Sequence, residues 1–331
     1  MKHLFSIVSM MIIANFTISS IVSAEVNSSE HKREIKREFA VSSSPILSIS
    51  NEFGTIRIIE GSSDKIIFKI TITGKGKDSD AAKKYAESVD VNFKQSSSNI
   101  SAKTIFEKIR CENNCGRNVD YEVTVPKNTK QVLENKFGDI KLNNTVEPLE
   151  IKLEFGKLYA NELSEADLSI QHGGGTINKC DKMKIKSSFS KYKFGEIGSM
   201  SGSISYDGID VEALANGDIK SDFSNMDIEN LKGSFHAKDF TYGSLKIANV
   251  SDNFSNIKVN SSFSTVKVGL TKNHNFKTTL YSSFGSIKTG SVVFYEKTLD
   301  KKDVVVGIAG KIKEPSATVE ISSSYGNIVF Q

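Results

Sequence analysis

The residues of this chain that could do chemistry include carboxylates that recur in close pairs. Three such pairs lie within one stretch: Asp207 and Asp210, Asp218 and Asp222, and Asp227 and Glu229. Because a glycosidase needs two carboxylates that face a sugar across a cleft, one hypothesis is a carbohydrate-active enzyme, either a glycoside hydrolase or a polysaccharide lyase. The stretch holds no Arg to bind a sugar acid, and the chain has no Trp to stack on a sugar ring. We therefore favour a solvated face of mixed charge and predict no catalytic residue.

In five copies of a short repeated motif, the residue after the aliphatic position is a lysine: Lys141, Lys246, Lys258, Lys267 and Lys288. If the surrounding segments stack, these lysines would form a column at strand spacing, and like charges so placed repel each other. A bound anion would relieve the repulsion, so Lys246, Lys258, Lys267 and Lys288 are a candidate site for an acidic glycan or an anionic envelope polymer. The alternative, which we favour, is a solvated lysine face that discourages aggregation.

The basic residues argue against a nucleic-acid partner. The arginines, which bind phosphates and bases with two hydrogen bonds, are confined to residues 33–117, and the net charge is only +4. Lysine alone supplies the positive charge of the rest of the chain.

Three cysteines are present. Cys111 and Cys115 could close a small loop through CENNC as a disulfide that contributes about 2 kcal/mol in an exported chain. Their spacing from Cys180 and from the histidines matches no zinc site, so we predict no metal and no cofactor. Cys180 is left as a free thiol or as the partner of an unassigned residue.

The elements that must position these side chains are indicated by a short repeated motif. Its clearest copies are SNEFGTIRI from Ser50, ENKFGDIKL from Glu134, KLEFGKLYA from Lys152, KSDFSNMDI from Lys220, SDNFSNIKV from Ser251, NSSFSTVKV from Asn260, YSSFGSIKT from Tyr281 and SSSYGNIVF from Ser322. An aromatic residue is followed by Gly or Ser, one free position and an aliphatic residue. Weaker copies occur at Gly174, Tyr206 and Tyr242, and between Phe155 and Tyr242 copies recur at roughly 15 to 19 residues.

Apolar residues alternate on both sides of each motif, but in opposite phase. Leu47, Ile49 and Phe53 are in step, whereas Ile56 and Ile58 follow in the other phase. Alternation at period two is typical of half-buried strands, and a phase change at Gly or Ser indicates a bend that lets both strands face one core.

A unit this short cannot bury its own apolar edge, so the units are expected to stack. We predict an all-β, repetitive β-solenoid, in the form of a parallel β-helix whose rungs carry inward Phe and Ile. The alternative is an antiparallel β-sandwich. The predicted organisation is a signal peptide (1–24), a polar lead-in (25–44), an N-terminal β region (45–126) and a β-repeat region (127–331).

Two segments depart from the repeat. Residues 78–89 (DSDAAKKYAESV) predict one short helix, with an Asp or Ser cap, that covers the open end of the solenoid. Near the C-terminus, SVVFYEKTL and DVVVGIAGKI, joined by a charged turn, predict a hairpin.

The first residues have the layout of a secretory signal. Lys2 and His3 precede an apolar run from Leu4 to Val22, and Val22-Ser23-Ala24 offers a cleavage site before Glu25. We therefore predict export to the periplasm or the cell surface, with no transmembrane segment after cleavage.

Taken together, these segments resemble a bacterial family of exported β-repeat proteins labelled "putative adhesin". VDYEVTVPKNTK, from Val119, is similar to the family's strand ahead of its repeats, and ATVEISSSYGNIVF, from Ala317, is similar to its last rung. The resemblance implies an envelope-associated, non-enzymatic β-solenoid and assigns no functional residues. The function we expect is adhesin-like binding of a polymer, a surface or a protein. A carbohydrate-active enzyme and a purely structural assembly protein are the alternatives.

Overall fold

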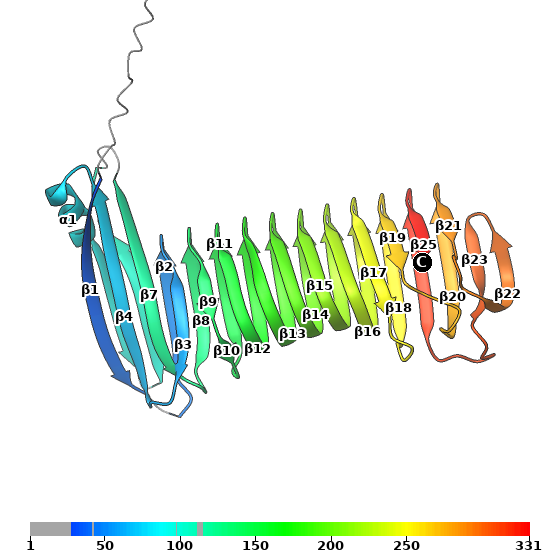
Figure 1. The fold of residues 1–331 in the computed structure, drawn as a ribbon, viewed down its shortest axis with the longest axis horizontal. Helices are drawn as coiled ribbons and strands as arrows, with labels where there is room; N and C mark the ends of the chain where they lie inside the picture. Colours follow the sequence, from blue (N-terminus) through cyan, green and yellow to red (C-terminus); the bar gives the residue numbers. More distant parts are fainter. Residues whose placement is uncertain (1–27, 42, 97, 111–114) are drawn as a thin grey trace, which may run out of the picture.

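The computed structural model describes residues 28–331 except residues 42, 97 and 111–114. It is a long stack of strands with one helix at its N-terminal end (Figure 1). The first strands are β1 (Ser29–Ala40), β2 (Ile46–Glu52), β3 (Ile56–Gly61), β4 (Lys65–Gly76), β5 (Val89–Ser96), β6 (Asn99–Phe106) and β7 (Gly116–Pro126), and the helix is α1 (Ser79–Glu87). The predicted signal peptide lies outside the described residues.

The middle of the molecule is a regular run of parallel strands. Its elements are β8 (Lys130–Lys136), β9 (Ile140–Leu142), β10 (Asn144–Thr145), β11 (Leu149–Glu154), β12 (Lys157–Gln171), β13 (Gly174–Ser188), β14 (Lys191–Ser205), β15 (Gly208–Asp222) and β16 (Asn225–Thr241). Each strand from β12 to β16 forms a whole rung, because its first half pairs on one face and its second half on the other. Leu158 of β12 pairs with Ile140 of β9, whereas Ala166 pairs with Leu149 of β11. The predicted β-solenoid with parallel rungs is confirmed.

Each rung therefore has two flat faces. We call them the pre-turn face, which leads into the repeated motif, and the post-turn face, which follows it. At the bend between the two halves of a rung, asparagines stack in register. The side-chain amide of Asn178 donates to the Oδ1 of Asn161 at 3.0 Å, and Asn161 donates to Asn144 at the same distance. These bonds hold neighbouring rungs in register at the corner.

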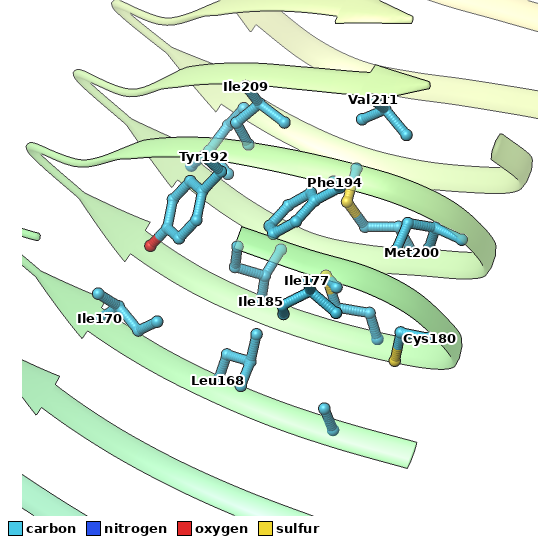
Figure 2. Close-up of a cluster of buried hydrophobic side chains, with 14 of the residues drawn as sticks. Leu168, Ile170, Ile177, Cys180, Ile185, Tyr192, Phe194, Met200, Ile209 and Val211 are labelled. Carbon is cyan, nitrogen blue, oxygen red and sulfur yellow. The ribbon is translucent and has the colours of Figure 1, made fainter. Parts of the chain in front are cut away.

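The core is a narrow band between the two faces. Figure 2 shows inward side chains from successive rungs, including Ile170, Ile185 and Phe194, in contact across this band. Inward positions such as Ile56 and Ile58 are buried, as the phase change of the sequence predicts. Burying an aliphatic or aromatic side chain of this size contributes roughly 1.5 to 3 kcal/mol, so the repeated inward residues hold the stack together.

The N-terminal end is closed by antiparallel strands and the helix. β7, β4 and β1 extend the post-turn face, and β6 and β5 extend the pre-turn face. The predicted helix is confirmed: Asp78 is its N-cap, its carboxylate accepts from the Ala81 amide at 2.8 Å, and α1 packs against β4 and β1. The first rung comes from residues 46–61, so the stack includes residues on both sides of the predicted boundary at residue 127. The segment predicted as a polar lead-in contains β1.

The C-terminal strands do not stack in chain order. They are β17 (Ser244–Val250), β18 (Asn256–Ser262), β19 (Thr265–Val268), β20 (Phe276–Ser283), β21 (Ser286–Lys288), β22 (Phe294–Lys301), β23 (Val304–Ala309), β24 (Thr318–Ser324) and β25 (Asn327–Phe330). The last rung, β24 and β25, lies between β18–β19 on one side and β20–β21 on the other. The hairpin of β22 and β23 then covers the far side of β20, which confirms the predicted hairpin.

Candidate functional site

The most extensive exposed apolar feature is a column of stacked rings on the edge where the pre-turn face meets the post-turn face. We call it the aromatic ladder. In spatial order its members are Phe53, Phe137, Phe155, His172, Phe189, Tyr206, Phe223, Tyr242, Phe263, Tyr325 and Phe284. Neighbouring ring centroids are 4.7 to 5.2 Å apart, and the ring planes are within 9° of parallel.

The backbone of each ladder residue is unusual. All members have a positive φ, between 48° and 58°, which is the left-handed region that normally favours Gly or Asn. A hydrogen bond to the next rung fixes each turn. The Phe155 amide donates to the Gln171 carbonyl oxygen at 3.0 Å, and the Tyr206 amide donates to the Asp222 carbonyl oxygen at 3.0 Å. The left-handed residue makes the chain turn from one face to the other and directs its own side chain outward.

The prediction that the rungs carry the motif's Phe inward is therefore wrong for the ladder members. Their rings stay 40% to 79% exposed, with Phe284 at the open end the most exposed of all. Strict alternation would place Phe155 on the same side as Leu153, but the left-handed turn interrupts the alternation at that residue. One motif copy behaves differently. Phe254, from SDNFSNIKV, is buried and belongs to no turn of this kind.

Small residues lie directly behind the ladder. The residue after the aromatic is Gly, Ser or Asp in every copy, and it approaches the backbone of the neighbouring rung. A Cβ added to Gly326 would lie 1.9 Å from the Ser264 carbonyl oxygen. Where the residue has a side chain, that side chain binds the preceding rung: Asp207 accepts from the Ser190 amide at 2.7 Å, and Ser264 accepts from the Gly243 amide at 3.0 Å. Burial raises the pKa of the Asp207 carboxyl.

Sequence reasoning missed two ladder members, His172 and Phe189. The signal was present in the spacing, because the ladder residues from Phe155 to Phe223 are each 17 residues apart. His172 stands where its neighbours have Phe or Tyr, and its ring stacks at 4.8 Å on Phe155 and at 5.0 Å on Phe189. Phe189 was not identified as a copy of the motif, because Tyr192 occupies the position that is aliphatic in the clearest copies.

The structure brings only part of the predicted lysine column together. Lys246 and Lys267 are neighbours on the post-turn face, and Lys288 is separated from Lys267 by Val329. Lys141 lies far along the same face, beside Tyr159. Lys258 is not in this column: it belongs to the copy with the buried Phe254, lies on the pre-turn face and forms an ion pair with Glu320 at 3.0 Å. The polyanion site on this face stays a prediction for Lys246, Lys267 and Lys288.

The fold separates the two members of the first carboxylate pair. Asp207 is buried behind the ladder, whereas Asp210 is exposed and lies next to Asp227 on the adjacent strand of the post-turn face. Lysines flank these two: Lys193 is beside Asp210, and Lys246 is beside Asp227. Asp210 and Asp227 therefore lie side by side on one flat face and do not oppose each other.

The remaining candidate groups are the possible metal ligands and the cysteines. Within the described residues, no three or more His, Cys, Asp or Glu side chains gather closely enough to hold a metal ion. Cys180 is a buried free thiol whose pKa is raised to about 12 by desolvation. Cys111 lies outside the described residues, so its disulfide with Cys115 stays a prediction. No helix in the described part of the chain is long and apolar enough to cross a membrane.

Comparison with known proteins agrees with this geometry. The family model described as Toastrack DUF4097 matches residues 46–330, from the first rung to the last. The chain belongs to the Toastrack family. This membership confirms the predicted resemblance to a β-repeat family. No curated protein matches the chain.

Three solved structures are similar to this Toastrack chain at low identity. A "putative cell adhesion protein" from Clostridium sporogenes is 10% identical, with 91% of this chain and 99% of that chain covered and a TM-score of 0.22. A "putative adhesin" from Bacteroides fragilis is 10% identical, with 90% and 97% covered and a TM-score of 0.31. A "putative lipid binding protein" from Parabacteroides distasonis is 11% identical, with 90% and 96% covered and a TM-score of 0.28.

Proposed function

We propose that this chain is an exported, envelope-associated binding protein rather than an enzyme, and that its aromatic ladder engages a polymer, a surface or another protein. The observation that supports this most is the ladder itself. Contiguous exposed apolar surface on a soluble domain is a mark of an interaction site, and here it follows one edge of the molecule from Phe53 to Phe284.

The turn itself does not require an exposed ring. A left-handed backbone costs a residue other than Gly about 1 to 2 kcal/mol, and Asn fits this backbone better than Phe or Tyr does. Stacking returns about 0.5 to 1.5 kcal/mol for each aromatic pair, in addition to the apolar area that the stacked faces bury. Stacking therefore stabilises the column, but the outer half of each ring stays in water and gains nothing from it. A binding role accounts for that exposed half.

The experiment is a retention and product screen against cell-envelope fractions and against acidic and neutral polysaccharides. We expect the chain from Glu25 onward to be retained without release of sugar product. A ladder variant, Phe189→Asn with Tyr206→Asn and Phe223→Asn, should lose most of that retention. The control, Tyr159→Asn with Tyr281→Asn, removes exposed rings outside the ladder and should be retained like the parent chain.

Two other results of this screen have defined meanings. Release of product from a polysaccharide would contradict the proposal and return attention to Asp210 and Asp227. Retention that depends on Lys246 and Lys267 but not on the ladder would assign binding to the predicted polyanion site. Lys258→Gln is the matched control for that arm, because Lys258 lies on the opposite face.

A further inference from the structure

The ladder presents only one part of each ring to a partner. Each interior ring is covered on both faces by its neighbours, with planes within 9° of parallel, so its outer edge is what remains exposed. A sugar ring stacks on the face of an aromatic side chain, and those faces are already used. The exposed edges suit an apolar partner that contacts a narrow ridge along its length.

We propose that this partner is a second copy of the chain, with the two aromatic ladders packed against each other in antiparallel orientation. The inference rests on the proposed function, because it names the partner of the same ladder. A partner must keep its contacts in register over many rungs, and the ladder repeats every 4.7 to 5.2 Å. A second ladder has that same period, and paired ladders of identical stacked side chains form dry, well-packed interfaces.

The available area is sufficient for a stable dimer. A fully buried Phe or Tyr removes roughly 150 to 250 Å² from solvent, so half-exposed rings offer on the order of 100 Å² each. Over the length of the ladder this reaches on the order of 1,000 Å² per copy, compared with about 800 Å² per partner in an interface of standard size. A two-fold axis would bury the same patch on both copies.

The order of ring types favours one register. Tyr206 is the sixth of the eleven members in space, so a two-fold axis through it pairs Tyr206 with itself. The same axis places His172 opposite Tyr242, and Phe189 opposite Phe223. Polar ring tips then meet polar ring tips at the centre, where a His–Tyr hydrogen bond can form, and most Phe rings meet Phe rings. The exception is Phe137, which faces Tyr325.

Charge and shape agree with the antiparallel orientation. The residues just before the ladder are Glu52, Lys136 and Glu154 at the N-terminal end, but Ser262, Ser324 and Ser283 at the C-terminal end. Antiparallel pairing therefore brings charged positions against neutral ones.

In Figure 1, β1, β4 and β7 rise above the line of turns, whereas the β22–β23 hairpin lies below it. The raised end of one copy would face the recessed end of the other.

Chemical cross-linking of variants with one added cysteine tests the proposed register. Tyr206→Cys should form a covalent dimer with a short bis-maleimide, which we prefer to a disulfide because the flanking rings hold the two backbones apart. Phe137→Cys should not cross-link alone, since Tyr325 lies opposite it, but a mixture of Phe137→Cys and Tyr325→Cys should give a heterodimer. The parent chain is the background control, and its Cys180 is buried.

Light scattering on the uncross-linked chain completes the test. We expect a dimer that the Phe189→Asn, Tyr206→Asn and Phe223→Asn variant converts to monomer, whereas the Tyr159→Asn and Tyr281→Asn control stays dimeric. Self-cross-linking of Phe137→Cys at the rate of Tyr206→Cys would overturn the antiparallel register.

A monomer at every concentration would overturn the inference altogether. If that monomer still needed the ladder for envelope retention, the proposed function would stand and only the second copy would be wrong. Ladder-dependent binding of the monomer to phosphatidylcholine vesicles would replace the second copy by a lipid surface.

Discussion

At the residue scale, the exposed rings and the buried inward residues contribute to stability in different ways. Phe223 lies at the turn just before β16, and Ile228 lies within β16. Phe223 is exposed and has a left-handed backbone, whereas Ile228 is buried. The ring gains stacking energy from two neighbours and loses backbone energy at the turn. The isoleucine has no such opposing cost.

Replacement of these two residues should separate binding from stability. We expect Phe223→Asn to lower the free energy of unfolding by only about 1 to 2 kcal/mol, because the relief of the left-handed backbone offsets part of the lost stacking on two neighbouring rings. Ile228→Ala should cost about 2 to 5 kcal/mol, because it leaves a cavity in the core. Denaturant unfolding of both variants measures this. A large loss for Phe223→Asn would mean that the ladder is chiefly a stabilising device.

The buried carboxyl of Asp207 predicts a pH effect with a definite sign. Desolvation raises its pKa in the folded state, so the folded chain binds the proton more tightly than the unfolded chain does. Its contribution to stability is present below the unfolded pKa of about 3.9 and is lost as the pH rises through the folded pKa.

Asp207→Asn should therefore raise the melting temperature at neutral pH, and the gain should shrink as the pH falls toward about 4. Asp210→Asn, at an exposed position three residues away, is the control for the loss of a carboxyl group as such. Calorimetry across this pH range checks the prediction, and an equal gain at all pH values would contradict it.

At the element scale, the rungs tolerate side chains at some glycines and not at others. Gly202, within β14, has a φ of 136°, and an added Cβ would lie 1.9 Å from the Ile185 carbonyl oxygen of the adjacent rung. Gly208, at the start of β15, has only the Lys191 side chain near, at 3.8 Å. The two glycines thus form a matched pair.

Gly202→Ala should destabilise the fold by more than about 1 kcal/mol, since both the backbone strain and the overlap oppose it. Gly208→Ala should be close to neutral. Thermal unfolding of the two variants gives the comparison, and equal melting temperatures would show that the rungs can spread locally to admit the methyl group.

Much of the fold could be predicted from the sequence because its signals are local. The alternation at Leu47 and Ile49, its change of phase before Ile56, and the capped helix after Asp78 all depend on residues close in the chain. The outward direction of Phe155 could not be read in this way, because alternation gives no sign that one residue adopts a left-handed backbone. Lys258 was misplaced for a related reason: Phe254 has the motif's neighbours but not its turn.

At the scale of the whole molecule, the order of rungs in space differs from their order in the chain. No local pattern reveals this, because it depends on pairing between segments far apart. Tyr325 stacks on both Phe263 and Phe284, each at 4.8 Å, so the last rung in the chain lies between two earlier rungs. The stack is continuous only when β24 and β25 are in place.

Deletion of residues 318–331 should leave β18 and β20 with unpaired edges and make the protein aggregate, because open edges pair with other chains. Deletion of the exposed Gln331 alone should have little effect. Soluble yield and light scattering report the difference. A soluble truncated chain with the oligomeric state of the parent would mean that β18–β19 and β20–β21 pair directly with each other.

The central claim, that the aromatic ladder is the binding surface, is tested most directly by chemical footprinting of tyrosines in dilute and in concentrated protein, with and without isolated cell envelope. Tyr206, Tyr242 and Tyr325 lie in the ladder, whereas Tyr281 and Tyr295 lie outside it and have similar exposure. We predict that the partner, whether a second copy or the envelope, protects the three ladder tyrosines from modification relative to the most dilute protein and leaves Tyr281 and Tyr295 reactive. Protection of Tyr281 and Tyr295 with the ladder still reactive would contradict the claim and place the binding surface elsewhere on the solenoid.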